Sequence, residues 1–250
     1  MKSRALITGA SSGIGFAYAK YLSEEGWILD LVSENKERSI KSKEKLDYPE
    51  ANFYLADLSK KSSIKEIISN YETPDLIVAN AGIAINGPIG KLNESQKEDA
   101  YYLMCGGIID LIEGFAPKMI KKGTGRIVII SSIGAITAMP KSSIYSSAKA
   151  GIYMYGKSIS AELKNKGISV TVSLPGYVET KAHKKAGLEH LKSKVPSWMW
   201  ISADKVVNQT EKASKNGKSE VIPGIVYKLT KPFLKFNAAI NVWRLITKKN

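Results

Sequence analysis

The chain has 250 residues, of which 44% are hydrophobic, and it carries a formal net charge of +14 with one cysteine and two histidines. This length and apolar content fit a single α/β domain with a large buried core. The lone cysteine, Cys105, excludes an intramolecular disulfide and a cysteine-rich metal site, and two histidines leave little material for a zinc site or a Ser-His-Asp triad, so we expect no metal.

The first predicted unit is a strand at residues 5–8, a glycine-rich turn and an amphipathic helix that ends near Glu25. The strand follows the N-terminus directly, without the apolar core of a signal peptide, and no later stretch reaches the ~18 uninterrupted apolar residues of a membrane span. Together with the single cysteine, these features predict a cytoplasmic protein.

A strand, a glycine-rich turn and a helix in this order form the context that a dinucleotide site requires. In such a site Gly9 permits the tight turn, Gly13 lets the backbone approach a pyrophosphate, and Gly15 allows close packing of helix on strand. The phosphates then meet the positive end of the helix dipole. The alternative is a glycine-rich connection that binds no ligand.

The second predicted strand, at residues 28–32, is followed by Glu34, roughly 20 residues beyond the glycines. A carboxylate at this point accepts hydrogen bonds from the adenosine ribose and repels a 2′-phosphate, while Lys36 and Arg38 offset that repulsion. NAD is therefore favoured over NADP, but only modestly. The alternative is an ordinary solvated carboxylate.

Further short apolar strands are predicted at residues 52–56, 76–79, 127–130 and 169–174, with helices between them, one of which Ser62 or Ser63 caps. Six or seven strands in this alternation predict a doubly wound parallel sheet, a Rossmann-type three-layer sandwich, formed by residues 1–250 as one domain. Ligands bind such sheets at the carboxyl ends of the strands. One crevice is expected to collect the polar residues found there, which are Gly9, Glu34, Asp57, Asn80 and Ser132.

Residues 126–151 carry the candidate chemistry. A buried strand ends at Ser132, and a loop leads to a helix that places Tyr145 and Lys149 four residues apart on one face. An ammonium beside a phenol favours the phenolate, so we expect Lys149 to lower the pKa of Tyr145. With Ser132 holding the substrate oxygen, the three side chains suit acid–base chemistry on a carbonyl/alcohol pair. Taken alone, Tyr-x-x-x-Lys also fits a solvated surface pair.

In their order and spacing these motifs resemble those of the short-chain dehydrogenase/reductase family. The shared motifs are Thr8-Gly9-x-x-x-Gly13-x-Gly15, Asp57, Asn80-Ala81-Gly82, Ser132, Tyr145-x-x-x-Lys149 and Pro175-Gly176-x-x-x-Thr180. The resemblance implies a cofactor site formed by Gly9, Ser11, Ser12, Gly13, Ile14, Gly15, Glu34, Asp57, Leu58, Asn80, Ala81, Gly82, Tyr145, Lys149, Pro175, Gly176, Val178 and Thr180.

The resemblance also implies what several of these residues do. Tyr145 is then the proton donor in reduction and the acceptor in oxidation, Lys149 binds the nicotinamide ribose, and Ser132 positions the substrate oxygen. Asp57 contacts the adenine, and Thr180 bonds near the carboxamide. Hydride passes between the nicotinamide of NAD or NADP and the carbon of a small ketone or secondary alcohol.

One position departs from the family pattern. Members commonly have an asparagine thirteen residues ahead of a proline, where it supports a water relay to the lysine; here Met104 takes that place relative to Pro117. A thioether donates no hydrogen bond and accepts one only weakly. Tyr101, Tyr102 or a backbone carbonyl then holds the water instead, or Met104 simply fills core volume.

Residues 177–203 match the substrate lid of the family. They contain lysines and the cluster Trp198-Met199-Trp200, which favours a partly apolar substrate with an anionic handle, or serves packing and solubility alone. The lysines of this segment are Lys181, Lys184, Lys185, Lys192 and Lys194.

Residues 231–250 form a basic amphipathic segment, which we expect to dock on its own domain or a partner subunit rather than on a membrane surface. Residues 181–250 hold 15 Lys or Arg against 4 Asp or Glu, but without a nucleic-acid motif this charge indicates a solvated face and no nucleic-acid partner. By resemblance the protein is a homodimer or homotetramer. The competing hypothesis to an oxidoreductase is a cofactor-binding sensor or scaffold with little turnover, which Met104 alone favours.

Overall fold

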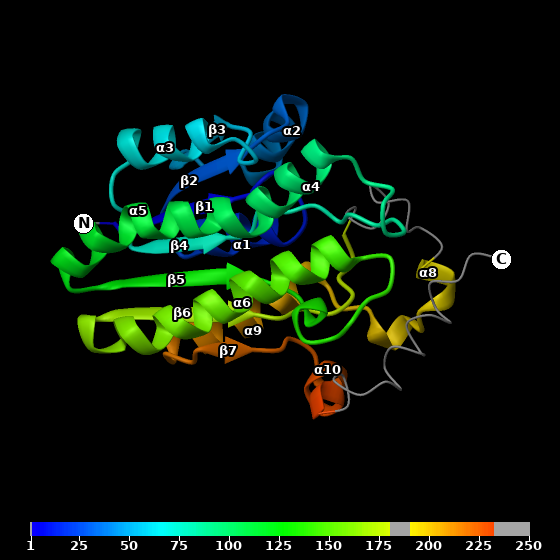
Figure 1. Cartoon of the computed structure of the whole chain (residues 1–250). Coiled ribbons are helices and arrows are strands. Elements are labelled where there is room, and N and C mark those ends of the chain that lie inside the picture. The colour runs from blue at the N-terminus through cyan, green and yellow to red at the C-terminus, as the bar shows by residue number, and fades with distance from the viewer. Residues whose placement is uncertain (1, 181–190, 233–250) are drawn as a thin grey trace.

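Within the residues that the computed structural model describes, 2–180 and 191–232, a seven-stranded sheet runs through the middle of the protein (Figure 1). Its order is β3-β2-β1-β4-β5-β6-β7, and every neighbouring pair is parallel. The strands are β1 (Arg4–Thr8), β2 (Ile28–Ser33), β3 (Ala51–Leu55), β4 (Leu76–Ala79), β5 (Gly125–Ile130), β6 (Ile168–Ser173) and β7 (Glu220–Val221).

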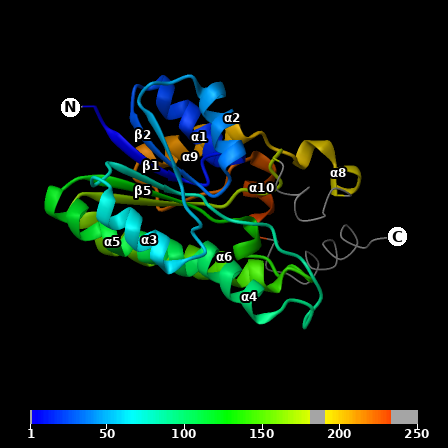
Figure 2. The same ribbon diagram turned by 90° about the horizontal axis from the view of Figure 1, so that it is seen from above.

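Helices cover both faces of the sheet (Figure 2). One face carries α3 (Lys61–Asn70), α4 (Glu94–Tyr101), α5 (Gly107–Lys122) and α6 (Ser143–Leu163). The other carries α1 (Gly13–Glu24), α2 (Lys36–Leu46) and α9 (Ala203–Lys215). The short helices α8 (Leu191–Lys194) and α10 (Ile225–Thr230) lie beyond the carboxyl ends of the strands (Figure 1).

The central strands divide their side chains between two cores. Along β4, Ile77 and Ala79 pack with the cluster under α3, α5 and α6, whereas Leu76 and Val78 pack with the cluster under α1. All four side chains are fully buried. A strand alternates its side chains between faces, so an uninterrupted apolar run fits a strand that is covered on both sides. The predicted doubly wound, three-layer α/β fold is confirmed.

The start of α3 differs from the sequence prediction. The helix begins at Lys61 with Lys60 as its N-cap and no side-chain cap bond, so the predicted capping by Ser62 or Ser63 is wrong. Both serines lie inside the first turn. The Asp57 carboxylate instead accepts hydrogen bonds from the Ser59 amide and hydroxyl at 2.9 and 2.7 Å, which turns the chain toward the helix.

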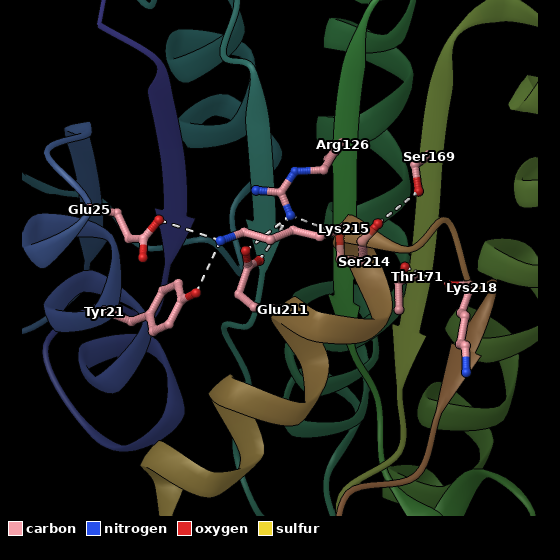
Figure 3. A network of polar contacts seen from close by, with 9 residues as sticks. All are labelled: Tyr21, Glu25, Arg126, Ser169, Thr171, Glu211, Ser214, Lys215 and Lys218. Atoms are coloured by element: carbon pink, nitrogen blue, oxygen red, sulfur yellow. Dashed lines mark hydrogen bonds and ion pairs between the residues drawn. The ribbon is translucent and has the colours of Figure 1, made fainter.

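A polar network fastens α9 to the sheet and to α1 (Figure 3). Arg126 of β5 donates to the Glu211 carboxylate at 3.0 Å and to the Ser214 hydroxyl at 3.1 Å. Glu211 is almost completely buried, with 1% of its side chain exposed. At the end of the same helix, Lys215 donates to the Tyr21 hydroxyl at 3.1 Å. A charged pair therefore lies under the helix layer, at the end of β5 away from the cleft described below.

Some predicted features lie outside the described residues. They are most of the C-terminal segment (233–250) and the lid residues Lys181, Lys184 and Lys185. In the part of the chain that is described, no helix is long and apolar enough to span a membrane.

Candidate active site

A cleft of about 650 Å³ opens at the carboxyl ends of the strands. It lies where the strand order reverses between β1 and β4, which is where doubly wound sheets bind their ligands. The five strand-end residues that the sequence predicted to share one crevice all line it, so this prediction is confirmed. They are Gly9, Glu34, Asp57, Asn80 and Ser132.

The glycine-rich turn has the shape that a close-lying phosphate needs. Gly9 and Gly13 have φ values of +66° and +58°, which side chains rarely adopt. The N-cap Ser12 makes no side-chain capping bond, so the first backbone N–H groups of α1 are open to another acceptor. The glycine-rich turn and these N–H groups together form an anion-binding site at the N-terminus of α1. The residues present fit a dinucleotide pyrophosphate.

Gly15 and Asn80 hold this turn against β4. A Cβ on Gly15 would lie 2.4 Å from the Gly9 carbonyl oxygen and 2.5 Å from Asn80 Nδ2. The Asn80 side chain donates to the Thr8 carbonyl at 2.9 Å, and its backbone N–H donates to Thr8 Oγ1 at the same distance. Gly15 thus packs behind the cleft without lining it, as expected of a glycine kept for close packing.

An acidic and a basic side chain both line the cleft beyond the end of β2. Glu34 and Arg38 both line it, and the Glu34 side chain is exposed. Asn35 caps α2 by accepting from the Arg38 backbone N–H at 2.9 Å, which fixes the start of that helix beside Glu34. Lys36, the other basic residue considered from sequence, is not part of the lining.

Ser132 and Tyr145 meet beside Gly134. Ser132 Oγ accepts a hydrogen bond from the Gly134 N–H at 3.0 Å, and a Cβ on Gly134 would lie 3.3 Å from Tyr145 Cε1. Burial raises the pKa of the Tyr145 hydroxyl, and a hydrogen bond with Ser132 opposes that rise only in part. The expectation that Lys149 lowers this pKa is therefore wrong for the protein alone.

Lys149 is buried and points at the sheet. Its Nζ donates to the Ile130 carbonyl oxygen at 3.0 Å, and its own carbonyl accepts from Ser131 Oγ at 2.9 Å. Burial lowers the pKa of Lys149 to about 8, while the nearby Cys105 thiol acts weakly in the opposite direction. The ammonium thus donates to a backbone carbonyl of the sheet, and no hydrogen bond between it and the Tyr145 hydroxyl is found among the described residues.

Met104 lies on a π-helical turn, Tyr102–Gly106, between α4 and α5. Its side chain is fully buried, and a Cβ on Gly82 would lie 3.6 Å from Met104 Cγ and 3.5 Å from Lys149 Nζ. The thioether side chain thus occupies space beside the lysine. Such turns often mark functional sites because they shift a helix out of its regular register.

The tyrosines considered as replacements for the missing asparagine face other partners. Tyr102 donates to Asp110 at 2.7 Å. The Tyr101 hydroxyl and the Cys105 thiol both lie near Gly151. A Cβ added to Gly151 would lie 3.5 Å from the Tyr101 hydroxyl oxygen and 3.0 Å from the Cys105 sulfur.

Several residues of the cleft lining were not singled out from the sequence. Four of them lie at or directly after the end of a predicted strand, two follow Asn80-Ala81-Gly82, and Leu103 lies on a helical turn for which the sequence carries no signal. They are Ser33, Ala56, Ile83, Ala84, Leu103, Ile130 and Ser131.

Comparison with known proteins gives concordant matches. The sequence model of the short chain dehydrogenase family matches residues 3–190. An uncharacterized oxidoreductase from Staphylococcus epidermidis is 31% identical over 180 residues, which cover 70% of this chain and 78% of that protein. A 3-oxoacyl-(acyl-carrier-protein) reductase from Chlamydia trachomatis is 31% identical over 187 residues, covering 72% and 75%.

Solved structures share the fold. A short-chain dehydrogenase from Sphingobium yanoikuyae in complex with NADPH superposes with a TM-score of 0.81 at 24% identity, covering 92% of each chain. An alcohol dehydrogenase from Comamonas testosteroni, described as specific for bulky-bulky ketones, gives a TM-score of 0.77 at 23% identity and the same coverage.

The chain belongs to the short chain dehydrogenase family. It is accordingly an NAD(P)-dependent oxidoreductase that transfers a hydride between a nicotinamide cofactor and a carbonyl/alcohol pair.

Proposed function

We propose that Tyr145 is the general acid and base of this reaction, with Ser132 and Lys149 as its partners. The observation that carries the proposal is that all three side chains line one end of the cleft that also contains the glycine-rich turn. Ser132 Oγ and the Tyr145 ring flank Gly134, where an added Cβ would lie 3.4 and 3.3 Å from them, so a carbonyl oxygen held by Ser132 lies within reach of the tyrosine proton.

The raised pKa of Tyr145 keeps its hydroxyl protonated at neutral pH, which suits proton donation during reduction. When bound, the nicotinamide cofactor supplies or takes up the hydride. Lys149 would hold the ribose hydroxyls of that cofactor, and Gly9, Gly13 and the start of α1 would hold its pyrophosphate. The chain's own contribution is to place the reacting carbon and to move one proton at Tyr145 Oη.

A screen of carbonyl compounds with NADH and NADPH tests the proposal, with loss of nicotinamide absorbance as the readout. We expect turnover of at least one ketone class. Tight cofactor binding without turnover of any carbonyl compound would instead support the sensor or scaffold.

We propose that NAD is preferred over NADP, because the Glu34 carboxylate lines the cleft at the end of β2 and repels a 2′-phosphate. Arg38 lines the same region and moderates that preference. NADH should bind more tightly than NADPH, and Glu34→Arg should reverse the order, with Glu37→Arg as a matched control outside the lining. Equal dissociation constants for the two cofactors in the unaltered protein would remove Glu34 as the discriminator.

The substrate is proposed to be partly apolar. Ile133 and Ala135, which follow Ser132, pack together with Met199 and Trp200 of the lid region against a buried cluster that contains Tyr177. A relative whose name assigns it a 3-oxoacyl substrate fits this view, since such a ketone carries an acyl chain. Turnover should therefore rise along a series of ketones of increasing chain length.

We further propose that the protein is a cytoplasmic homodimer or homotetramer.

A further inference from the structure

Tyr227 lies in α10, beyond the part of the chain that matches the family model, which ends at residue 190. Its side chain is nonetheless buried beneath the cleft, with 3% exposed. It packs in a small core with Leu174, Tyr177 and Val195, which come from the end of β6 and from the lid region. Helix α10 thus reaches the segment that carries the Pro175-Gly176 motif.

The hydroxyl of Tyr227 joins two separate segments. It accepts a hydrogen bond from the Tyr177 backbone N–H at 3.0 Å and donates one to the Met199 carbonyl oxygen at 2.6 Å. Burial raises the pKa of Tyr227 to about 12, so the hydroxyl keeps the proton that it donates at neutral pH. The hydroxyl oxygen of Tyr227 therefore links the backbone at Tyr177, just after Gly176, to the backbone at Met199 in the lid region.

The ring of Tyr227 explains why residue 176 is a glycine. A Cβ on Gly176 would lie 2.0 Å from Tyr227 Cζ, so no side chain fits between the motif and the ring. The two segments that the hydroxyl joins also pair directly, because the Ile201 N–H donates to the Tyr177 carbonyl at 2.9 Å and the Glu179 N–H to the Ile201 carbonyl at 3.0 Å. Tyr227 lies at the base of this pairing.

The segment that Tyr227 supports lies on the catalytic side of the cleft. The Ile133 N–H donates to the Pro175 carbonyl at 3.0 Å, which ties the motif to the residue after Ser132. Pro175, Gly176, Val178 and Thr180 all line the cleft, whereas Glu34 and Asp57 line it at the ends of β2 and β3. Displacing the motif should therefore disturb one half of a bound dinucleotide and spare the other.

We propose that Tyr227 is a positioning residue for the nicotinamide half of the cofactor, acting through the backbone of residues 175–178 and through the lid. This inference rests on the proposed cofactor site. Replacing Tyr227 by Phe keeps the ring beneath Gly176 and removes only the two hydrogen bonds. The adenine half, held by the glycine-rich turn and by residues at the ends of β2 and β3, should not respond.

The test compares dissociation constants of NADH and of ADP-ribose, which lacks the nicotinamide, for the full chain and for Tyr227→Phe. We expect NADH to bind about fivefold more weakly to the variant, the effect of about one net hydrogen bond, with ADP-ribose unchanged within about twofold. Tyr155→Phe is the matched control, because it removes a hydrogen bond from the Tyr155 hydroxyl of α6 to Glu113 of α5, and neither residue lines the cleft. It should change neither constant.

Equal weakening of both ligands in Tyr227→Phe would indicate a general structural role and overturn the inference. Unchanged binding of both would overturn it as well. Failure of the unaltered protein to bind either ligand would be a different result, because it would remove the proposed cofactor site and, with it, the inference.

Discussion

Tyr145 and Lys149 show how burial acts on two neighbouring titratable groups in opposite senses. Loss of water disfavours the charged form of each, so it raises the pKa of the phenol and lowers that of the ammonium to about 8. Lys149 lines the same cleft as Tyr145. Its Nζ bond to the Ile130 carbonyl keeps it at the edge of the cleft, where a ribose would meet it.

Replacing Tyr145 by Phe should lower turnover by about 10² or more and leave cofactor binding nearly unchanged, because it removes the proton donor and little else. Steady-state rates and cofactor dissociation constants measure the two effects. The same change at Tyr155, on the same helix, should leave turnover intact. Retention of most activity in Tyr145→Phe would show that another group delivers the proton.

The depressed pKa of Lys149 predicts how stability changes with pH. Its folded-state value of about 8 lies below the ordinary 10.5, so between these pH values the unfolded chain binds the extra proton and rising pH favours the folded state. Below pH 8 the cost of the buried ammonium is present in full. The gain across the interval is roughly 3 kcal/mol.

Urea unfolding at several pH values, compared between the unaltered protein and Lys149→Met, isolates this contribution because every other group is shared. The stability advantage of the methionine variant should shrink as pH rises from about 8 toward 10.5. Parallel curves for the two proteins would contradict a depressed lysine pKa.

At the scale of elements, the sequence predicts the strands better than it predicts the turns between helices. Uninterrupted apolar runs such as residues 76–79 identify central strands because both faces of the sheet are covered, and the glycine-rich turn identifies the cleft. The π-helical turn at Tyr102–Gly106 has no comparable signal.

The parts that could not be predicted depend on tertiary contacts. The two-residue strand β7 is too short to show any periodicity, and Tyr227 gains its place only when α10 folds back beneath Gly176. The charge state of Tyr145 likewise follows from burial and from the direction in which Lys149 points. Neither the burial of Tyr145 nor the direction of the Lys149 side chain can be predicted from the four-residue spacing of these two residues.

The π-helical turn gives Met104 a testable role. If Met104 is a core residue, Met104→Asn should leave the amide unsatisfied and destabilise the protein by about 1–3 kcal/mol without raising turnover. Met104→Leu, which keeps the site apolar, should cost less than about 1.5 kcal/mol. Melting temperatures and turnover together decide, and a rate gain with an unchanged melting temperature would show that a proton relay to Lys149 had been weakened by the methionine.

On the scale of the whole molecule, the two ends of the strands have separate tasks. The carboxyl ends hold the cleft, while the opposite end of β5 holds the buried pair of Arg126 and Glu211, which fastens α9 over the sheet (Figure 3). Removing one member of a buried pair leaves the other charge uncompensated. Stability and cofactor binding should therefore respond independently to changes at the two ends.

Glu211→Leu is expected to lower the free energy of unfolding by about 3–5 kcal/mol, because it leaves the Arg126 guanidinium without its carboxylate under the helix layer. The double variant Arg126→Met/Glu211→Leu should recover most of that loss, since buried ion pairs are often replaced by apolar side chains at little cost. Glu25→Gln, which breaks an ion pair with Lys215 in which both side chains are 46% exposed, should cost less than about 1 kcal/mol. Urea unfolding measures all three, and the dissociation constant of NADH should not change in any of them. A double variant no more stable than Glu211→Leu would show that the pair itself, and not the stranded charge, stabilises the fold.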